Sequence, residues 1–277
     1  MIQFRTLEHT PVPAIAQAFN EAFSDYMVPL QLTEASLRAK MLSENIQLTH
    51  AAGAFAGDRL VGFILLATGS IYGKTTLYNG GTGVVPAWRG RRLTEQLYAF
   101  IRSEVADAEQ HLLEVITTNE KAIKAYTKTG MHVRRTFNCF KGNCIATPAD
   151  GLVLQKRTTI PAFNPADFWD FQPSWQNTTA AVERALSDHH IFIITNGGRL
   201  LGYIVFAAAT GRIKQLAVRK DQRGQGIGTT LLTAVARALP GKEITAINAD
   251  SSNTAITDFF RRNGLQPFLQ QYEMVMP

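Results

Sequence analysis

The chain has 277 residues, of which 45% are hydrophobic and 18% charged, and its net charge is +6. These values are ordinary for a globular protein of one or two domains. The charge divides into +3 on either side of Asn143, which excludes a basic arm for nucleic acid. The apolar runs fall short of the ~20 residues that span a bilayer, and the N-terminal segment lacks a signal-peptide core. We therefore expect a cytoplasmic protein without membrane contact; with only Cys139 and Cys144 as cysteines, we expect no disulfide framework.

The first half of the chain predicts a mixed succession of strands and helices. A strand at 2–6 precedes a helix entered after Pro13, and Thr33 is a typical N-cap for a second helix. Apolar patterns then predict three strands, a helix that follows a basic loop, a strand, a short helix and a final strand. The three strands are expected at 46–56, 60–67 and 75–85. The helix after the basic loop is expected at 93–108, the next strand at 111–117, the short helix at 119–128 and the final strand at 133–140.

The second half repeats the first. The segment "VVPAWRGRRLTEQL", which starts at Val84, recurs as "VRKDQRGQGIGTTL", which starts at Val218, so that Arg89 falls opposite Arg223. Asn119 and Asn253 lie at the same distance beyond these two arginines, and each opens a helical pattern. Upstream, "GDRLVGFILLA" in the first half matches "GGRLLGYIVFA" in the second. Three matching blocks in the same order predict two copies of one domain.

The second basic segment has the pattern of a phosphate-binding loop. A strand pattern that ends at Val218 leads into the glycine-rich loop 221–228, and an apolar-periodic helix follows to Leu239. Glycines let the backbone turn sharply and point N–H groups at an anion, and the helix N-terminus adds positive potential. The nucleoside-triphosphatase loop is excluded because no lysine precedes Thr229, and the dinucleotide fingerprint needs a third glycine where Thr229 stands.

What remains, Arg-x-x-Gly-x-Gly from Arg223 to Gly228, resembles the pyrophosphate loop of the GNAT superfamily, the acetyl-CoA-dependent N-acetyltransferases. The expected element order, β-α-α-β-β-β-loop-α-β-α-β, is also similar to the GNAT order. The resemblance implies an α/β fold with mixed sheets whose strands splay beside each loop. It implies two tandem GNAT domains, at 1–142 and 157–277, joined by a linker and crossover at 143–156.

In this family the pyrophosphate rests on loop amides, and the pantetheine arm runs along the preceding strand like an added strand. The resemblance therefore implies a CoA-binding set in each copy. The first set is Val84, Val85, Arg89, Gly90, Arg91, Arg92, Leu93, Thr94 and Asn119, and the second is Leu216, Ala217, Val218, Arg223, Gly224, Gln225, Gly226, Ile227, Gly228, Thr229 and Asn253.

The two copies depart from the family pattern at complementary places. Tyr126 stands in the helix opened by Asn119, where the family has the tyrosine that protonates the departing thiolate, whereas Phe260 at the matching position has no proton to donate. Conversely, Arg92 stands opposite Gly226, a position that favours a left-handed backbone or a close approach. We expect the first copy to be equipped for chemistry with an altered loop. The second is expected to bind CoA without the usual acid.

The general base is less constrained by the sequence. Glu114 lies within an apolar strand, opposite Asn248 of the second copy, and burial would raise the pKa of its carboxyl to suit proton abstraction through water. A salt-bridged structural role for Glu114 is the equal alternative. Asp25 and Tyr26 are expected to line the acceptor pocket or else to cap a helix. Trp169 and Trp175 are expected in the core or at a domain contact, with stacking on a substrate as the alternative.

The sequence thus predicts an N-acetyltransferase that uses acetyl-CoA as cosubstrate and acetylates an amine of a small molecule or peptide by direct attack in a ternary complex. The alternative is a non-catalytic acyl-CoA-binding or sensing protein, which the departures at Phe260 and Arg92 favour. No metal is expected, because the six histidines follow no ligand spacing. No nucleic acid is expected, because basic residues are not interleaved with an aromatic stripe. The acceptor and the formation of a homodimer are left open.

Overall fold

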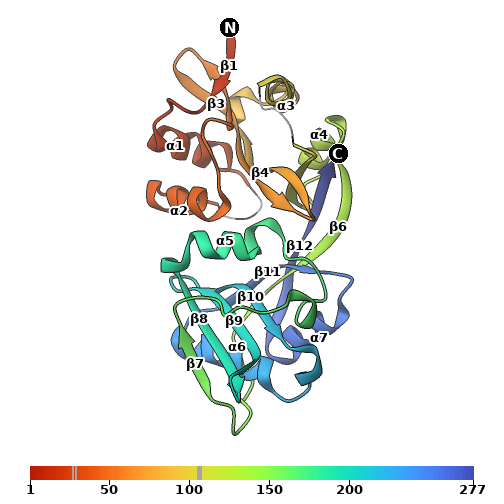
Figure 1. Cartoon of the computed structure of the whole chain (residues 1–277). Coiled ribbons are helices and arrows are strands. Elements are labelled where there is room, and N and C mark those ends of the chain that lie inside the picture. The colour runs from red at the N-terminus through yellow and green to blue at the C-terminus, as the bar shows by residue number, and fades with distance from the viewer. Residues whose placement is uncertain (27, 29, 105–107) are drawn as a thin grey trace. The chain divides into compact units, whose positions relative to one another are not determined.

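The computed structural model describes residues 1–26, 28, 30–104 and 108–277 (Figure 1). Contacts divide the chain into two compact units: unit 1 comprises Met1–Arg134 and Glu273–Pro277, and unit 2 comprises Arg135–Tyr272. Each unit is a mixed sheet with helices, so the predicted α/β class is confirmed. Among the described residues, no helix is long and apolar enough to cross a bilayer.

The sheet of unit 1 has the order β1-β2-β3-β4-β5, followed by the end of β12. The first four strands pair antiparallel with their neighbours, whereas β5 joins β4 in parallel. A parallel neighbour requires a crossover connection, which α3 provides. The strands are β1 (Ile2–Thr6), β2 (Ala52–Ala56), β3 (Arg59–Ile71), β4 (Lys74–Val84), β5 (Gln110–Ile116) and β12 (Leu265–Met276).

In unit 1, α1 and α2 cover one face of the sheet, and α3 and α4 cover the other (Figure 1). The second helix begins at the predicted N-cap, where Thr33 Oγ1 accepts a hydrogen bond from the Ser36 amide at 3.1 Å. It ends at Asn45 in a left-handed conformation, with φ 62°. The helices are α1 (Val12–Ala22), α2 (Glu34–Glu44), α3 (Leu93–Glu104) and α4 (Glu120–Lys128).

Several predicted elements differ from the structure in length. The strand expected at 60–67 extends over Arg59–Ile71, and the one expected at 133–140 extends over His132–Gly142. The strand expected at 46–56 is reduced to Ala52–Ala56, because the left-handed end of α2 is followed by a turn at 48–50. The helix expected at 93–108 ends at Glu104 within the described residues, and the predicted continuation over 105–107 lies outside them.

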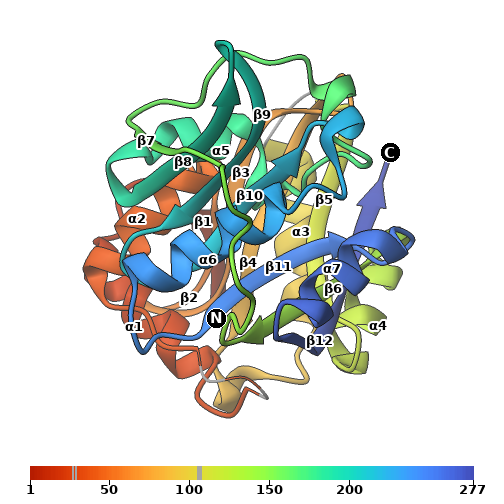
Figure 2. The same cartoon turned by 90° about the horizontal axis from the view of Figure 1, so that it is seen from below.

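The sheet of unit 2 has the order β12-β6-β11-β10-β9-β8-β7, and again one pair, β10 and β11, is parallel. Side chains of β9 alternate between the faces. Tyr203 and Val205 pack with Val182 of α5, whereas Ile204 and Phe206 pack in a second cluster with residues of α6, which lies across the strands in Figure 2. The strands are β6 (His132–Gly142), β7 (Leu154–Arg157), β8 (His189–Asn196), β9 (Arg199–Ala207), β10 (Arg212–Val218) and β11 (Ile244–Asp250), and the helices are α5 (Thr179–Arg184), α6 (Ile227–Ala238) and α7 (Thr254–Arg262).

The contact units do not coincide with the two sequence copies. β6, from the first copy, pairs antiparallel with β11 in unit 2, and the last residues of the second copy, Glu273–Pro277, belong to unit 1. The segment 143–156, expected to be the linker, lies within unit 2. The domain boundaries at 142 and 157 therefore stay a prediction about the sequence repeat. The compact units have other boundaries, because most of β6 lies in unit 2 and the last residues of β12 lie in unit 1.

In each copy a gap opens between the two parallel strands. β5 pairs with β4 only over Thr76–Asn79, although β4 continues to Val84. In the second copy, β11 pairs with β10 only over Arg212–Ile213, although β10 continues to Val218. Beyond these short ladders the strands splay beside each loop, as the family resemblance implies.

The two gaps begin at equivalent residues. The pairing of β4 with β3 shifts register between Asn79 and Gly81, and the pairing of β10 with β9 shifts between Ile213 and Gln215. These two positions match in the repeat alignment, by which we mean the alignment of the copies that sets Arg89 against Arg223. A β-bulge at this point turns the strand away from its neighbour. The repeat alignment therefore matches β4 with β10 residue by residue.

Candidate active site

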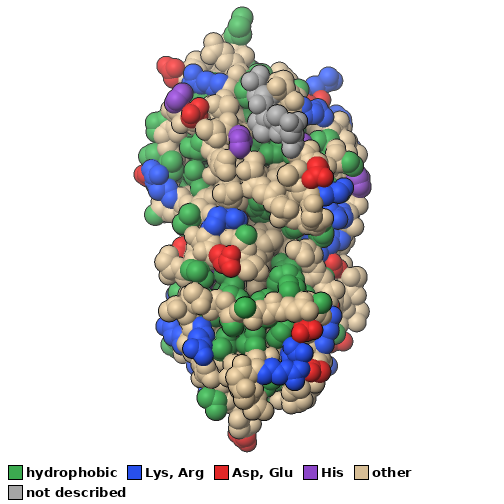
Figure 3. Space-filling view, in the orientation of Figure 1, with side chains coloured by type: hydrophobic (Ala, Val, Ile, Leu, Met, Phe, Trp, Pro, Cys, Tyr) green, Lys and Arg blue, Asp and Glu red, His purple; other side chains and the backbone are tan. Residues whose placement is uncertain are grey.

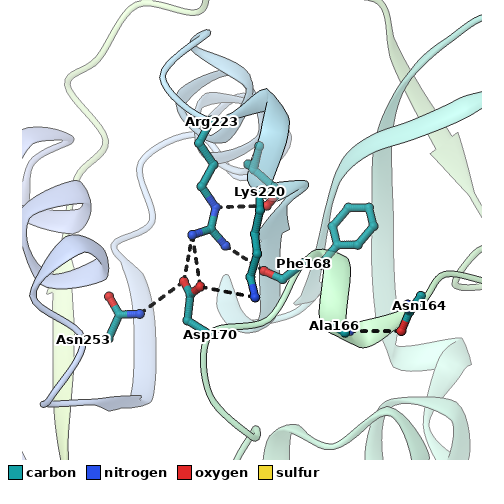
Figure 4. Close-up of polar contacts among 8 residues, drawn as sticks. Asn164, Ala166, Phe168, Asp170, Lys220, Arg223 and Asn253 are labelled. Atoms are coloured by element: carbon teal, nitrogen blue, oxygen red, sulfur yellow. Dashed lines mark hydrogen bonds and ion pairs between the residues drawn. The ribbon is translucent and has the colours of Figure 1, made fainter.

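Arg223, in the loop of the second copy, is held by a network of short contacts (Figure 4). Its Nε donates to the carbonyl of Val218 at 3.3 Å, and its Nη2 donates to the carbonyl of Phe168 at 2.8 Å. Its Nη1 lies 2.9 Å from the Asp170 carboxylate, and Lys220 Nζ lies 4.0 Å from the same group. The guanidinium therefore fastens the loop to the segment before α5.

Arg89 makes the same set of contacts in the first copy. Its Nε donates to the carbonyl of Val84 at 3.2 Å, and its Nη2 donates to the carbonyl of Ala22 at 2.9 Å. Both terminal nitrogens bind the Asp25 carboxylate, at 2.6 and 2.8 Å, and this hydrogen bonding lowers the pKa of Asp25. Bidentate pairing of this kind is geometrically specific. Asp25 was predicted from the sequence as a site residue and its counterpart Asp170 was not, although an Asp follows an aromatic residue or segment in both copies.

The two predicted asparagines cap helices at the loops. Asn119 Oδ1 accepts from the Ala122 amide at 3.2 Å, and Asn253 Oδ1 accepts from the Ile256 amide at 3.0 Å. Asn253 also donates to Asp170 at 3.2 Å. A side-chain cap satisfies one of the unpaired amides at a helix start, so each asparagine fixes the start of α4 or α7.

The phosphate-loop backbone has the same form in both copies. Gly224 and Gly226 have φ values of 78°, and Gly226 is the N-cap of α6 without a side-chain cap. The matching residues Gly90 and Arg92 have φ values of 78° and 57°. The first-turn amides of a helix lack intrahelical partners and carry the positive end of its dipole. Both loops can therefore present N–H groups to a phosphate.

Arg92 adopts the left-handed conformation that glycine adopts more easily. Such a backbone costs a non-glycine residue roughly 1 kcal/mol or more. We expect Arg92→Gly to raise the free energy of unfolding by about 0.5–1 kcal/mol once the entropy cost of glycine is subtracted, and so to raise the melting temperature. Gly90→Ala, where nothing lies within 4 Å of the new Cβ, is the reciprocal control and should lower it. Thermal unfolding of both variants tests the assignment, and a less stable Arg92→Gly protein would contradict it.

Tyr126 belongs to a buried hydroxyl network on the α3 and α4 side of unit 1. Tyr126 is 8% exposed; its burial raises its pKa, and hydrogen bonding between its hydroxyl and the side chains of Thr82 and Asn79 lowers that pKa in part. Asn79 Nδ2 also donates to Thr82 Oγ1 and to Tyr98 Oη, both at 2.7 Å. Burial raises the pKa of Tyr126, so the hydroxyl keeps its proton at neutral pH and is able to donate it.

Glu114 is a half-buried carboxylate, and only one of its two oxygens has a hydrogen-bond partner among the described residues. Its Oε2 accepts a hydrogen bond from the Tyr78 hydroxyl, whereas its Oε1 is buried and has no partner among the described residues. Burial raises the pKa of Glu114 to about 7, an effect that the Tyr78 hydrogen bond reduces. The carboxyls of Glu273 and Glu44 add repulsion, which the ammonium of Lys40, 2.7 Å from Glu44, partly offsets. A carboxylate that titrates near neutral pH suits general-base catalysis.

The two candidate catalytic groups flank the gap from opposite faces of the sheet. Successive residues of a strand point to opposite faces, and Tyr78 bonds to Glu114 while the next residue, Asn79, bonds to Tyr126. The β4–β5 ladder ends at the Asn79–Leu113 pair, so Glu114 is the first residue beyond it. The gap thus has a base candidate on one side and an acid candidate on the other.

The effect of Glu114→Gln on stability and on kcat/KM should depend on pH. The folded carboxyl has a pKa of about 7, above its ordinary 4.5, so its contribution to stability is complete below pH ~4.5 and is lost as pH rises through 7. The variant should therefore be more stable than the parent at pH 8 but not at pH 4. If Glu114 is the base, kcat/KM should also fall roughly tenfold at pH 8, and its rise between pH 6 and 8 should vanish. If the pH–rate profile is unchanged while the pH dependence of the melting temperature changes, Glu114 has a structural role and is not the general base.

The predicted acceptor pair, Asp25 and Tyr26, divides between two places. Asp25 binds Arg89, as described above, whereas the Tyr26 hydroxyl accepts from Asn119 Nδ2 at 3.4 Å. Tyr26 also lies near enough to Tyr126 to raise its pKa. The structure brings Tyr26 to the acid candidate, and the acceptor role of both residues stays a prediction.

The second copy contains a cavity of about 630 Å³ that joins its loop to its gap. The predicted CoA set lines it except for Gln225 and Asn253. Phe260 also lines it, and its ring packs 5.0 Å from that of Phe140. Trp169 packs against the buried cluster of α5, as expected, but it also lines the cavity and donates its indole N–H to Tyr203 at 2.9 Å. The position of Trp169 in the cavity lining is compatible with the alternative of substrate stacking, which stays a prediction.

The described residues bear on two other kinds of site, a metal centre and a nucleic-acid surface. No three His, Cys, Asp or Glu side chains come together among them in a way that could hold a metal ion. On the face drawn in Figure 3, Lys and Arg side chains are spread among Asp and Glu and are not gathered in one stripe. A basic stripe is the usual footprint of a nucleic-acid surface.

The family model of the GNAT acetyltransferases matches residues 13–131 and 158–265. The two matched segments correspond to the two copies predicted from the repeat. A search of curated proteins gave no matching sequence.

Several solved structures share this fold over the full chain. A GCN5-related N-acetyltransferase from Sphaerobacter thermophilus superposes with a TM-score of 0.69 at 17% identity, covering 99% of this chain and 95% of its own. A tandem GNAT protein from the clavulanic acid biosynthesis pathway gives 0.70 at 16% identity, with coverage of 100% and 98%. A putative acetyltransferase from Pyrococcus horikoshii gives 0.67 at 15%, with coverage of 99% and 89%. At these identities the likeness establishes the tandem fold.

Proposed function

Because the chain belongs to the GNAT acetyltransferase family, we propose that it transfers an acetyl group from acetyl-CoA to an amine of a small molecule or peptide, with the chemistry in the first copy. The family implies use of an acyl-CoA and an amine acceptor. The observation that carries the assignment is the placement of Glu114 and Tyr126 on opposite faces of the sheet, where β4 and β5 separate.

The proposed reaction uses these two side chains as base and acid. The acceptor amine loses a proton, through water, to the Glu114 carboxylate, and its nitrogen lone pair forms a bond to the thioester carbonyl carbon. The carbon–sulfur bond then breaks, and the sulfur receives the proton of the Tyr126 hydroxyl. Thr82 and Asn79 hold that hydroxyl in place. Positioning and proton transfer are the main contributions expected from the chain.

The loop of the first copy supports CoA binding in spite of its departure from the family pattern. Its backbone repeats that of the second loop, with left-handed residues at Gly90 and Arg92. Arg91 stacks on Trp88, 4.4 Å from the ring centroid, and Arg89 is engaged with Asp25. The loop amides and the side chain of Arg92 are therefore the groups proposed to meet the phosphates.

Turnover of acetyl-CoA with a panel of amines tests the proposal. Release of free thiol should depend on an amine and should fall in the Tyr126→Phe variant. Binding of acetyl-CoA without amine-dependent thiol release, across diamines, amino sugars, amino acids and peptides, would instead favour the alternative of an acyl-CoA-binding protein.

A further inference from the structure

The second copy lacks the whole hydroxyl network of the first, not the tyrosine alone. The repeat alignment places apolar residues at all four network positions. Ile213 stands for Asn79, Leu216 for Thr82, Leu232 for Tyr98 and Phe260 for Tyr126. All four belong to or pack against one buried apolar cluster, and Ile213, Leu216 and Phe260 also line the 630 Å³ cavity. The wall that donates hydrogen bonds in the first copy is hydrocarbon in the second.

The far end of this cavity has few polar atoms to offer. Trp169 donates to the Tyr203 hydroxyl, which donates to Gln215 Oε1 at 3.1 Å. Gln215 Nε2 in turn donates to the carbonyl of Asn177 at 2.8 Å. The polar groups of these hydrogen-bonded side chains are therefore directed at one another. The remaining acceptor, Asn177 Oδ1, is buried without a partner among the described residues and suits a single N–H donor.

Of the charged residues that line the cavity, Asp170, Lys214 and Arg223 are engaged, whereas Arg262, at the end of α7, is exposed. Asp170 and Arg223 bind each other at the loop. Lys214, at the bulge of β10, donates to the carbonyl of Gln176 at 3.2 Å. Asn248, which replaces Glu114, donates to Ser174 at 3.1 Å. Phe168, Trp169, Phe171 and Pro173 add apolar side chains to the lining.

We propose that the second copy is a binding site for a CoA thioester whose acyl group is a hydrocarbon chain longer than acetyl, and that this thioester is not transferred there. The proposal rests on the CoA-binding role proposed for the loop. Hydrocarbon at the position of the acid leaves no donor for a departing thiolate, and the same hydrocarbon favours burial of added methylenes. A cavity of this volume lies in the usual range for a ligand of moderate size.

A series of thioesters titrated calorimetrically into the full chain without amine tests the site. From acetyl- to butyryl- to hexanoyl-CoA, the Kd of the second copy should fall about threefold to fourfold for each methylene until the cavity is filled. Butyryl- and succinyl-CoA are a matched pair of similar length, and succinyl-CoA should bind at least tenfold more weakly because its carboxylate would be buried. The Gly226→Arg variant identifies which isotherm belongs to the second copy.

Other outcomes would overturn the proposal. Equal Kd values for acetyl- and butyryl-CoA would show that no apolar chain is held, and tighter binding of succinyl-CoA would show that a cation of the lining, Lys214 or Arg262, selects a carboxylate. Leu216→Thr gives the second copy, at a half-buried position, the residue that the first copy has there, and should reduce the preference for longer acyl chains. Thr82→Leu is the reverse exchange in the first copy. Acceptor acetylation is measured separately by thiol release, so failure of the transferase assignment and failure of this site are distinguishable.

Discussion

Replacing Tyr126 with phenylalanine is expected to lower kcat about 100-fold or more and to leave the KM for acetyl-CoA nearly unchanged. The hydroxyl is needed only when the thiolate leaves, so its loss removes stabilisation of the transition state and not of the bound thioester. Steady-state kinetics with the best acceptor measure both constants. Because the hydroxyl is buried and bonded to Thr82 and Asn79, we also expect a loss of about 1 kcal/mol in unfolding free energy.

Tyr98→Phe is the matched control for this prediction. It deletes another hydroxyl of the same network, one that accepts from Asn79 at 2.7 Å and is fully buried. The stability loss should be similar, whereas kcat should change by only a few fold. Phe260→Tyr in the second copy should leave turnover unchanged or raise it. If Tyr126→Phe retains full turnover while Gly226→Arg abolishes it, the second copy is the enzyme and our assignment is wrong.

The repeat was the sequence feature that predicted most about the fold. Its constant register placed both loops and both capping asparagines, because each copy needs the same strand, loop and helix to hold the same backbone, whereas the two gaps were implied by the family resemblance. Local chemistry was also visible, since Thr33 caps α2 and glycines occupy left-handed positions of the second loop. The pairing of strands was less visible. Nothing in a local pattern shows that residues of β6 join unit 2 while the last residues of β12 join unit 1.

The candidate site was only partly predictable, because its key contacts join residues distant in sequence. Glu114 could be chosen from one polar residue in an apolar strand, but its Tyr78 partner and its neighbours Glu44 and Glu273 come from three other elements. The hydroxyl network was missed for the same reason. Asn79, Thr82, Tyr98 and Tyr126 lie on three elements, and only the structure shows that the second copy changes all of them together.

Gly226→Arg is expected to weaken binding of a CoA thioester to the second copy by several kcal/mol, or more than 100-fold in Kd. A Cβ at this position would lie 2.5 Å from the Cβ of Ala149, and φ is 78°, a conformation that costs arginine free energy. The side chain therefore has to displace the segment 146–150 or distort the loop. Distortion would turn the amides from Gly224 to Gly228 away from a pyrophosphate. Calorimetry gives the affinity, and thermal unfolding gives the accompanying loss of stability.

Two controls separate the backbone from the crowding at Gly226. Gly224→Ala has the same φ of 78° with nothing within 4 Å of its Cβ, so it reports the conformational cost alone. The pair Gly226→Ala and Ala149→Gly forms a double-variant cycle in which the second change removes the 2.5 Å contact. If affinity returns in the double variant, the loss came from crowding by Ala149. If it does not, the left-handed glycine itself is required. Unchanged affinity in Gly226→Arg would mean that the loop amides do not bind the pyrophosphate, because no placement of that side chain leaves both Ala149 and the loop backbone undisturbed.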